Sequence, residues 1–204
     1  MEVIRRGAEA EIRRGEWMGR DVMFKARVPK AYRNPELDGS LRALRTKNEA
    51  RLMQEARGLG VPTPVIYDID VIGSEIVMQE IKGPRVKDLL DSADDAVREK
   101  ICEEIGRMVA LLHEGGMTHG DLTTSNMIFA DGRVWFIDFS LGGKNATPEE
   151  MGVDLHLLKE AFQSAHSDML RFYDVILRSY SSHFARSDEV RKKIKSIEDR
   201  GRYT

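Results

Sequence analysis

The sequence predicts an α+β fold of two lobes, a small β-rich lobe with one helix and a mostly helical second lobe. Near the N-terminus, short strand-like segments are separated by glycine-bearing turns, which is typical of an antiparallel meander. From about residue 97 onward, apolar residues recur three and four positions apart, which is helical spacing. A chain of 204 residues is long enough for one sizeable domain or two small lobes.

The first lobe is expected to span residues 1–80. Its strands are predicted at residues 2–6, 10–14, 22–27, 65–69 and 75–80. A helix is predicted between the third and fourth strands, with Ser40 as its N-cap and its end near Arg57. The segment before it, residues 28–40, is polar and contains two prolines, so we expect a loop there.

A linker at residues 81–84 is expected to lead into the second lobe, residues 85–204. Its first long helix is predicted from a stripe of apolar residues and ends at the Gly115-Gly116 pair. Residues 127–129 and 134–137 are predicted to form a hairpin, because the Asp-Gly pair between them favours a tight turn. After Pro148 the sequence indicates helices to its end.

Composition narrows the class of protein. A formal net charge of -2 gives no overall attraction to nucleic acid, so any basic surface must be local. The single cysteine, Cys102, excludes an intramolecular disulfide and a multi-cysteine zinc site, which fits a reducing cytoplasm. No apolar run approaches the roughly 20 residues that a membrane span needs, so we expect a cytoplasmic protein without membrane attachment.

The segment that indicates chemistry begins at His119 and reads H-G-D-L-T-T-S-N. The predicted hairpin connects it to Asp138-Phe139-Ser140. Phosphoryl transfer from ATP needs a carboxylate that accepts the proton of the attacking hydroxyl, and oxygen ligands that hold Mg²⁺ against the phosphates. Asp121 fits the first role, and Asn126 and Asp138 fit the second. The spacing matches the kinase signature H-R-D-L-x-x-x-N followed by D-F-G, so a protein-kinase-like fold is expected.

A lysine and a glutamate of the first lobe complete the expected ATP site. Lys25 ends the strand V-M-F-K, which resembles the V-A-I-K strand of kinases. An ion pair from Lys25 to Glu49 of the predicted helix would direct the ammonium group at the phosphates. Glu55 is the nearest competitor for this role.

Further nucleotide contacts are expected from the first turn and from the linker. Met78 is predicted at the back of the adenine pocket, and main-chain groups of the following residues at the adenine edge. The residues assigned to ATP binding from these segments are Gly7, Ala8, Glu9, Ala10, Gln79, Glu80 and Ile81. His119 and Asp154 are expected to brace the catalytic loop, although Asp154 also fits a helix N-terminal acid favoured by the dipole.

Several motifs together resemble one subfamily, the small atypical kinase subunit of the KEOPS complex, which makes threonylcarbamoyladenosine in tRNA. They are G-A-E-A at 7–10, K-A-R-V-P-K-A-Y-R at 25–33, R-T-x-x-E-A at 45–50, the catalytic loop, and R-G-R at 200–202. The resemblance covers essentially the whole chain. It implies ATPase activity supporting tRNA modification, weak serine/threonine autophosphorylation, ATP and Mg²⁺ as cofactors, and the threonylcarbamoyl-transferase subunit as partner beside other KEOPS subunits.

The chain departs from ordinary kinases in three places. The glycine-rich phosphate loop is missing, and only Gly7 remains of it. Gly120 replaces the arginine that pairs with a phosphorylated activation loop in many kinases. No A-P-E segment follows Asp138, so the platform for peptide substrates is largely absent. These losses argue against efficient phosphorylation of other proteins.

Two basic regions bear on a tRNA partner. Residues 20–57 carry ten basic and five acidic residues, and residues 186–202 carry seven basic and four acidic ones. Each region is either an ordinary solvated face or a contact for the phosphate backbone. By resemblance, Arg200 and Arg202 are expected in a mobile tail that reaches the RNA or the active site.

Two other functions remain open from the sequence. The chain could be an independent kinase similar to the RIO atypical kinases, or a small-molecule phosphotransferase of the same fold. It could also be a pseudo-enzyme that only scaffolds a complex, although the intact set of catalytic residues argues against this. The sequence does not reveal the physiological phosphate acceptor.

Overall fold

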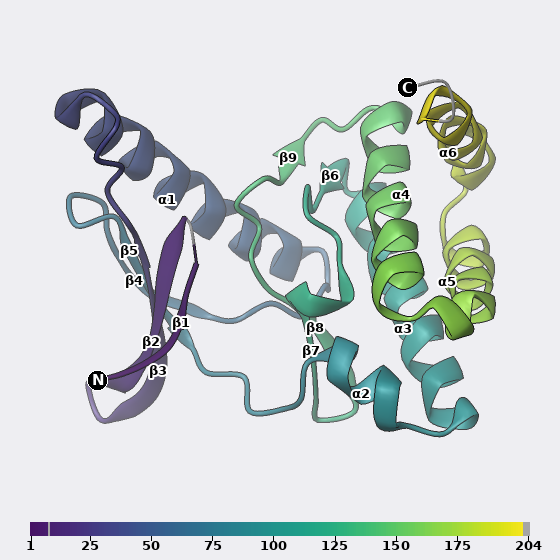
Figure 1. Cartoon of the computed structure of the whole chain (residues 1–204), viewed down its shortest axis with the longest axis horizontal. Coiled ribbons are helices and arrows are strands. Elements are labelled where there is room, and N and C mark those ends of the chain that lie inside the picture. Colours follow the sequence, from purple (N-terminus) through teal and green to yellow (C-terminus); the bar gives the residue numbers. More distant parts are fainter. Residues whose placement is uncertain (8, 202–204) are drawn as a thin grey trace.

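The computed structural model describes residues 1–7 and 9–201 and shows two lobes side by side (Figure 1). The first lobe is an antiparallel five-stranded sheet with one helix, as predicted. Its elements are β1 (Glu2–Arg6), β2 (Ala10–Trp17), β3 (Arg20–Arg27), α1 (Pro35–Gly58), β4 (Ile66–Asp70) and β5 (Glu75–Gln79). The strand order across the sheet is β1-β2-β3-β5-β4.

The second strand is longer than predicted. The sequence placed a turn at residues 15–20, but β2 continues to Trp17 and pairs with β3 down to Trp17 and Arg20. Gly15 does not interrupt the strand, since it pairs with Val22 of β3 in the continuous β2–β3 register. Phe24 lies against Gly15, 3.1 Å from where a Cβ atom would be. The turn is therefore limited to Met18 and Gly19, which both have positive φ, as a two-residue hairpin requires.

The start of α1 is also a correction. The helix begins at Pro35 and not at Ser40, so residues 35–40 are not a loop. Asn34 is the N-cap, and its side-chain oxygen accepts hydrogen bonds from the main-chain N–H groups of Glu36 and Leu37. A capping Asn followed by Pro at the first helical position is a stronger start signal than a lone serine. The Asn side chain accepts hydrogen bonds from unpaired N–H groups of the first turn, and Pro has no N–H group that would need a partner there.

The second lobe is mostly helical. Its elements are α2 (Val86–Ser92), α3 (Asp95–Glu114), β6 (Met117–Thr118), β7 (Met127–Ala130), β8 (Arg133–Phe136), β9 (Gly143–Lys144), α4 (Pro148–Ala165), α5 (Leu170–His183) and α6 (Ser187–Gly201). The predicted hairpin is β7–β8. The sequence did not predict α2 as a separate helix or the two-residue pairing of β6 with β9. Within the described ranges, no helix combines the length and the apolar character that a membrane span requires.

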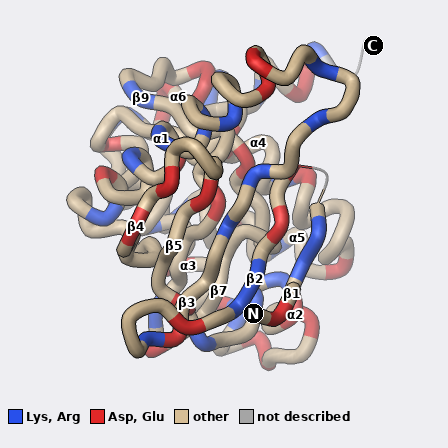
Figure 2. Tube along the Cα trace, turned by 90° about the vertical axis from the view of Figure 1, so that its left-hand side faces the viewer, with Lys and Arg blue, Asp and Glu red and all other residues tan. Residues whose placement is uncertain are grey.

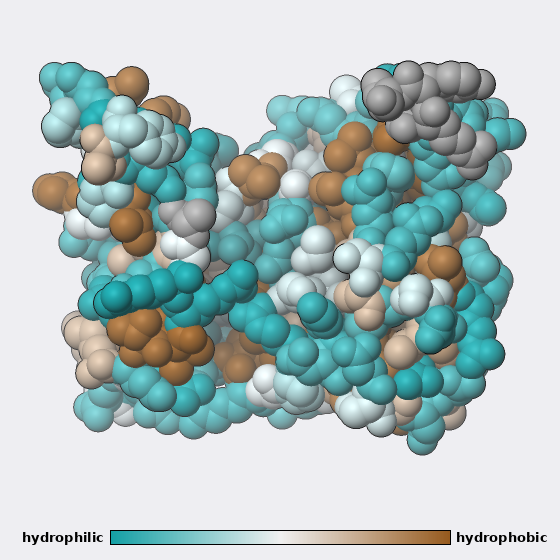
Figure 3. Space-filling view, viewed as in Figure 1, coloured by the Kyte–Doolittle hydropathy of each residue, from teal (hydrophilic) through white to brown (hydrophobic). Residues whose placement is uncertain are grey.

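The main hydrophobic core lies in the second lobe and extends into the first. It packs α3 against α5 and α4, and it also includes Leu52, Met53 and Ala56 from the C-terminal half of α1. The cluster belonging to the sheet alone is small and centres on Val22 and Phe24. In Figure 1, α1 runs from the outer end of the first lobe toward the second, and Figure 3 shows the hollow between the lobes. One end of α1 is therefore fixed to the second lobe, which sets its position relative to the catalytic loop.

Candidate active site

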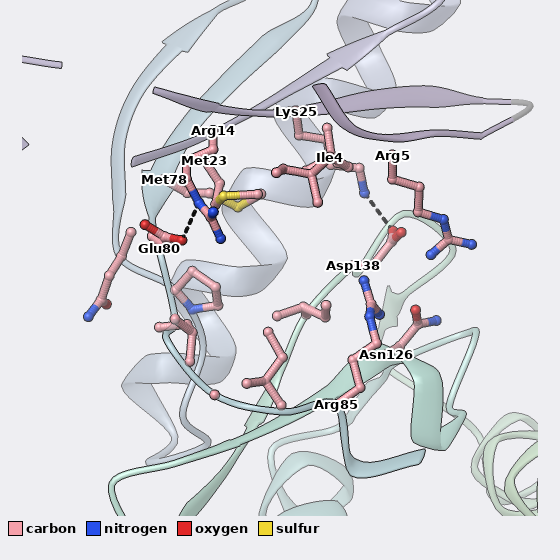
Figure 4. Close-up of a pocket in the computed structure, with 17 residues that line it drawn as sticks. Ile4, Arg5, Arg14, Met23, Lys25, Met78, Glu80, Arg85, Asn126 and Asp138 are labelled. Atoms are coloured by element: carbon pink, nitrogen blue, oxygen red, sulfur yellow. Dashed lines mark hydrogen bonds and ion pairs between the residues drawn. The ribbon is translucent and has the colours of Figure 1, made fainter. Parts of the chain in front are cut away.

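A cleft between the sheet and the second lobe is lined by seven of the residues expected at the site, namely Lys25, Met78, Gln79, Glu80, Ile81, Asn126 and Asp138 (Figure 4). Asp121 and Glu49 are not among its lining residues. Its apolar walls come from both lobes and suit a flat ring: they are Ile4, Ile12, Met23, Met78, Ile128 and Ile137. Its charged and polar lining includes Lys25, Asn126 and Asp138. Met78, which the sequence predicts at the back of an adenine pocket, is one of the residues that line the cleft.

Asp121 and Asn126 are held together in the catalytic loop. The amide nitrogen of Asn126 donates to the Asp121 carboxylate at 2.8 Å and to the Asp121 carbonyl at 3.0 Å. The Asn126 carbonyl accepts a hydrogen bond from the main-chain N–H of Ile137 at 3.0 Å. This bond fixes the end of the β7–β8 hairpin to the loop, so that Asp138 follows directly beside Asn126. The amide oxygen of Asn126 is left for a cation, because its nitrogen is committed to Asp121.

Asp138 projects into the cleft from a strained position. Its φ is +65°, and its carboxylate is 2.7 Å from the ammonium nitrogen of Lys25 and accepts a hydrogen bond from the Ser140 hydroxyl. Burial acts to raise the pKa of Asp138, but the charge and hydrogen bond of Lys25, together with Ser140, outweigh burial and lower the pKa to about 2. The carboxylate is therefore ionised at neutral pH and able to bind a metal ion.

Lys25 and Glu49 form the ion pair that the sequence predicted. The Lys25 nitrogen is 2.5 Å from one Glu49 oxygen, and both side chains are buried. Glu55, the competitor, contacts Lys144 instead at 2.9 Å. Lys25 also donates to the Ser140 hydroxyl at 3.1 Å, so it links the helix to the segment around Asp138.

Arg27 was not anticipated as part of the site. Its guanidinium nitrogen is 2.6 Å from the second oxygen of Glu49, and its side chain is also buried. Glu49 therefore binds two cations, one with each carboxylate oxygen. The sequence does contain a signal for this role of Arg27. Side chains two residues apart on a strand lie on the same face, so Arg27 shares the face of β3 that carries Lys25.

Asp154 braces the catalytic loop as expected. Its two oxygens accept the main-chain N–H groups of His119 at 2.7 Å and Gly120 at 2.8 Å, and His113 lies 3.4 Å away. The His119 ring contacts the Ile137 carbonyl with Nε2 at 3.0 Å and accepts the Asp121 N–H with Nδ1 at 3.3 Å. Burial lowers the pKa of His119, so the ring is neutral and fits this pair of bonds.

The glycine in place of the usual arginine at position 120 has a steric cause. Gly120 has a φ of +80°, and a Cβ atom there would lie 2.0 Å from the Leu141 carbonyl oxygen. A side chain does not fit without moving the segment after Asp138. The catalytic loop and the segment after Asp138 approach closely here, and the pairing of β6 with β9 holds them together. This close approach is the reason why position 120 is a glycine.

Replacing Asp154 with asparagine should lower both stability and turnover. Asparagine has one side-chain oxygen, so it can accept only one of the two main-chain N–H groups that Asp154 binds. Its NH₂ group would face the other N–H group, and two donors cannot form a hydrogen bond. An unsatisfied buried donor costs about 1–3 kcal/mol of the free energy of unfolding. A displaced loop should also slow ATP turnover roughly tenfold or more. Urea unfolding and steady-state ATP hydrolysis measure the two effects. The exposed Asp174→Asn on α5 is the control, and equal behaviour of both variants would contradict the bracing role.

The linker residues line the cleft, and the described residues of the first turn do not. Gln79, Glu80 and Ile81 line the cleft, and Glu80 forms an ion pair with Arg14 of β2 at 2.6 Å. The N–H of Gln79 already donates to the Val65 carbonyl at 2.8 Å. The assigned residues Gly7, Glu9 and Ala10 are not among those lining the cleft, where Ile4, Arg5 and Ile12 of the flanking strands are found instead. Ala8 lies outside the described residues.

The position of Arg200 near the C-terminus differs from the predicted mobile tail. Arg200 belongs to helix α6 and forms an ion pair with Glu149 at the start of α4. The prediction of a mobile tail is therefore wrong for Arg200, because the amphipathic α6 packs on α4 and carries this residue with it. Arg202 lies outside the described residues.

Two more arginines lie at the cleft without having been predicted. Arg5 comes from β1 and Arg85 from the residue before α2. The Arg85 guanidinium donates a hydrogen bond to the Ser125 carbonyl in the catalytic loop. No sequence motif sets Arg5 or Arg85 apart from the other members of the 32 lysines and arginines of the chain. Only the folded structure shows that these two residues line the cleft.

Comparisons with known proteins show which proteins the chain is similar to. Residues 21–173 match the family described as the RIO domain. The chain is 43% identical to the KEOPS complex subunit Bud32 of Pyrococcus abyssi, over 100% of this chain and 96% of that protein. It is 39% identical to a probable serine/threonine-protein kinase BUD32 homolog of Archaeoglobus fulgidus, over 97% of this chain and 94% of that protein.

Two further comparisons extend the range. The chain is 41% identical to a probable bifunctional tRNA threonylcarbamoyladenosine biosynthesis protein of Methanothermobacter thermautotrophicus, but all of this chain spans only 37% of that protein. Its fold is similar to that of the Rio2 kinase from Chaetomium thermophilum, solved as a complex with ADP/Mg²⁺ and phosphoaspartate, with a TM-score of 0.65. The match covers 98% of this chain and 72% of that one at 14% identity, which indicates the fold alone.

Proposed function

Because the chain belongs to the RIO-domain family of atypical kinases, in the group of the Bud32 subunits, we propose that it is a Mg²⁺-dependent ATPase and atypical serine/threonine kinase that supports threonylcarbamoyladenosine formation in tRNA. The observation that carries the proposal is the position of Lys25, which contacts both Glu49 and Asp138 beside Asn126. This arrangement brings a phosphate-binding cation and oxygen ligands for a metal to one side of the cleft.

Each side chain has a role that its contacts support. Asp121, held by the Asn126 amide, is oriented to accept the proton of an attacking hydroxyl or water. Lys25, held by Glu49, binds phosphate oxygens. The Asn126 oxygen and the Asp138 carboxylate are the hard oxygen donors that Mg²⁺ prefers. Mg²⁺ bound there with ATP would neutralise charge that develops on the phosphates.

The adenine is proposed to lie between the apolar walls of the two lobes, next to Met78. The main chain of Gln79, Glu80 and Ile81 would meet its edge. Ile81 is the favoured donor, because the N–H of Gln79 is already bonded to Val65, whereas the described residues provide no partner for the N–H of Ile81. His119 and Asp154 would act through the catalytic loop by fixing its main chain.

The proposed partners are the threonylcarbamoyl-transferase subunit, other KEOPS subunits and tRNA, and the proposed location is the cytoplasm. Relatives named as KEOPS subunits support membership in such a complex. Fewer basic side chains of residues 20–57 can contact tRNA than their number suggests. Lys25 and Arg27 are buried against Glu49, and Arg42 is paired with Asp38. Figure 2 shows positive and negative residues interspersed over the molecule.

Mixing the chain with the transferase subunit and tRNA tests the proposal. Formation of threonylcarbamoyladenosine should depend on ATP and on this chain, and it should be lost with Asp121→Asn or Asp138→Asn. Full modification by both variants would remove the catalytic role and leave a scaffold. Robust phosphate transfer to a protein or small molecule without any partner would instead favour an independent RIO-like kinase or phosphotransferase.

A further inference from the structure

Among the described residues, four cations line the cleft, and two of them form no ion pair. Arg14 is paired with Glu80, and Lys25 is paired with Glu49 and Asp138. Within the described part of the chain, neither Arg5 nor Arg85 forms an ion pair. The two come from opposite lobes, Arg5 from β1 and Arg85 from the start of α2.

Arg85 lies in a position that calls for an anion. Its side chain is half-buried, and its guanidinium is fixed by the Ser125 carbonyl, next to Asn126. Figure 4 shows it directed from the second lobe toward Asp138, while Arg5 reaches from β1 to the same side of the cleft. Burial, followed by the positive charge of Arg5, lowers the pKa of Arg85, and the carboxylates of Asp88 and Asp138 oppose this shift only in part. A partly buried guanidinium that lies near another cation and has no described ion-pair partner within 4 Å is stabilised when a further negative group binds between the two cations.

The missing glycine-rich loop leaves a role for such a pair. In this chain the described residues of the β1–β2 turn are not among those that line the cleft, and the N–H of Gly7 already donates to the Ala10 carbonyl at 2.9 Å. We propose that Arg5 and Arg85 form a two-lobe clamp on the phosphate groups of the bound nucleotide, in place of a glycine-rich loop. The planar guanidinium suits phosphate, because it donates two parallel hydrogen bonds to two oxygens. The identity of the nucleotide as ATP rests on the proposed function.

The clamp has consequences that a purely structural role lacks. It contacts the phosphates and not the base, so it should distinguish ATP and ADP from adenosine. It joins the lobes through the ligand, so nucleotide binding should draw them together. Part of the attraction is between exposed charges, so the contribution of Arg5 should decrease as the salt concentration rises.

Binding measurements on the full chain test the clamp. ATP, ADP and adenosine would compete, with Mg²⁺ present, against a fluorescent adenine nucleotide on the wild type, Arg5→Gln, Arg85→Gln and the double variant. Arg85→Gln should weaken ATP binding roughly tenfold, and the exposed Arg5→Gln roughly threefold, from the loss of a charge-assisted hydrogen bond. Adenosine affinity should stay within about twofold, because the base contacts are unchanged.

Neighbouring residues provide matched controls. Arg6→Gln removes a charge from the same strand, and Lys87→Gln removes one from the same helix, and neither residue lines the cleft. Both should bind ATP as the wild type does. The melting temperature without nucleotide would show that each variant is folded. If Arg85→Gln does not fold, Arg5→Gln decides the question, since Arg5 is exposed and has no described side-chain partner to lose.

Three results would overturn the clamp. Equal weakening of ATP and adenosine by Arg85→Gln would mean that Arg85 only supports the loop through Ser125. Wild-type ATP affinity in Arg5→Gln and Arg85→Gln would remove both residues from the phosphate site while leaving the proposed function intact. A wild-type protein that does not bind ATP would overturn the proposed function as well as the clamp.

Discussion

Replacing Asp138 with asparagine should lower ATP turnover at least about a hundredfold, because the substitution removes the negative charge of the proposed Mg²⁺ ligand. Asparagine keeps the size of the side chain and tolerates the positive φ of this position. It loses the negative charge that would bind Mg²⁺ and that now contacts Lys25 at 2.7 Å. The rate of phosphate release at saturating Mg²⁺ and ATP is the measurement.

Stability should change little in this variant. The buried Lys25 keeps its ion pair with Glu49 at 2.5 Å, and the Asp138 side chain is 39% exposed. Loss of the contact should therefore cost about 1 kcal/mol or less of the free energy of unfolding. Asp131→Asn is the matched control, since Asp131 lies in the turn of the same hairpin and also has a positive φ, of +52°. Undiminished turnover in Asp138→Asn would show that the metal role is misassigned.

Replacing Glu49 with glutamine should produce the largest loss of stability, about 3–5 kcal/mol in the free energy of unfolding. The reason is the pair of buried cations that share this carboxylate. Lys25 would keep Asp138 at 2.7 Å, but Arg27 would keep only Glu9 at 3.9 Å. Arg27 would then be a buried charge without a close partner. Urea unfolding measures the loss, and ATP affinity should fall with it because Lys25 is no longer held from the helix side.

A second substitution separates this explanation from simple loss of packing. Adding Arg27→Met to Glu49→Gln removes the stranded charge, so the double variant should lose less stability than the sum of the two single variants. Glu55→Gln on the same helix is the control. Its contact with Lys144 is partly exposed, and it should cost about 1 kcal/mol or less. Additive losses from Glu49→Gln and Arg27→Met would argue against a shared buried network.

The two-lobed architecture and the catalytic motif were predictable from the sequence because their signals are local. The hairpin after Asn126 is short, so a turn propensity was enough to place Asp138 near Asn126. The pair of Lys25 and Glu49 was predictable only through the resemblance to kinases, since 24 residues separate them and no periodicity relates them. The start of α1 differs from the prediction although its signal is local, because the prolines at 29 and 35 favour a loop over residues 28–40 while Asn34 and Pro35 together cap the helix.

What the sequence determined by itself is therefore the set of elements and the residue types that chemistry requires, because both depend on neighbours along the chain. The tertiary structure decided which cations share a carboxylate, which remain without one, and why Gly120 has no side chain. These properties depend on segments that lie far apart in sequence and come together only when α1 packs on the second lobe and β6 meets β9. Desolvation and contact act over a few ångströms in space, and a linear sequence does not record those distances.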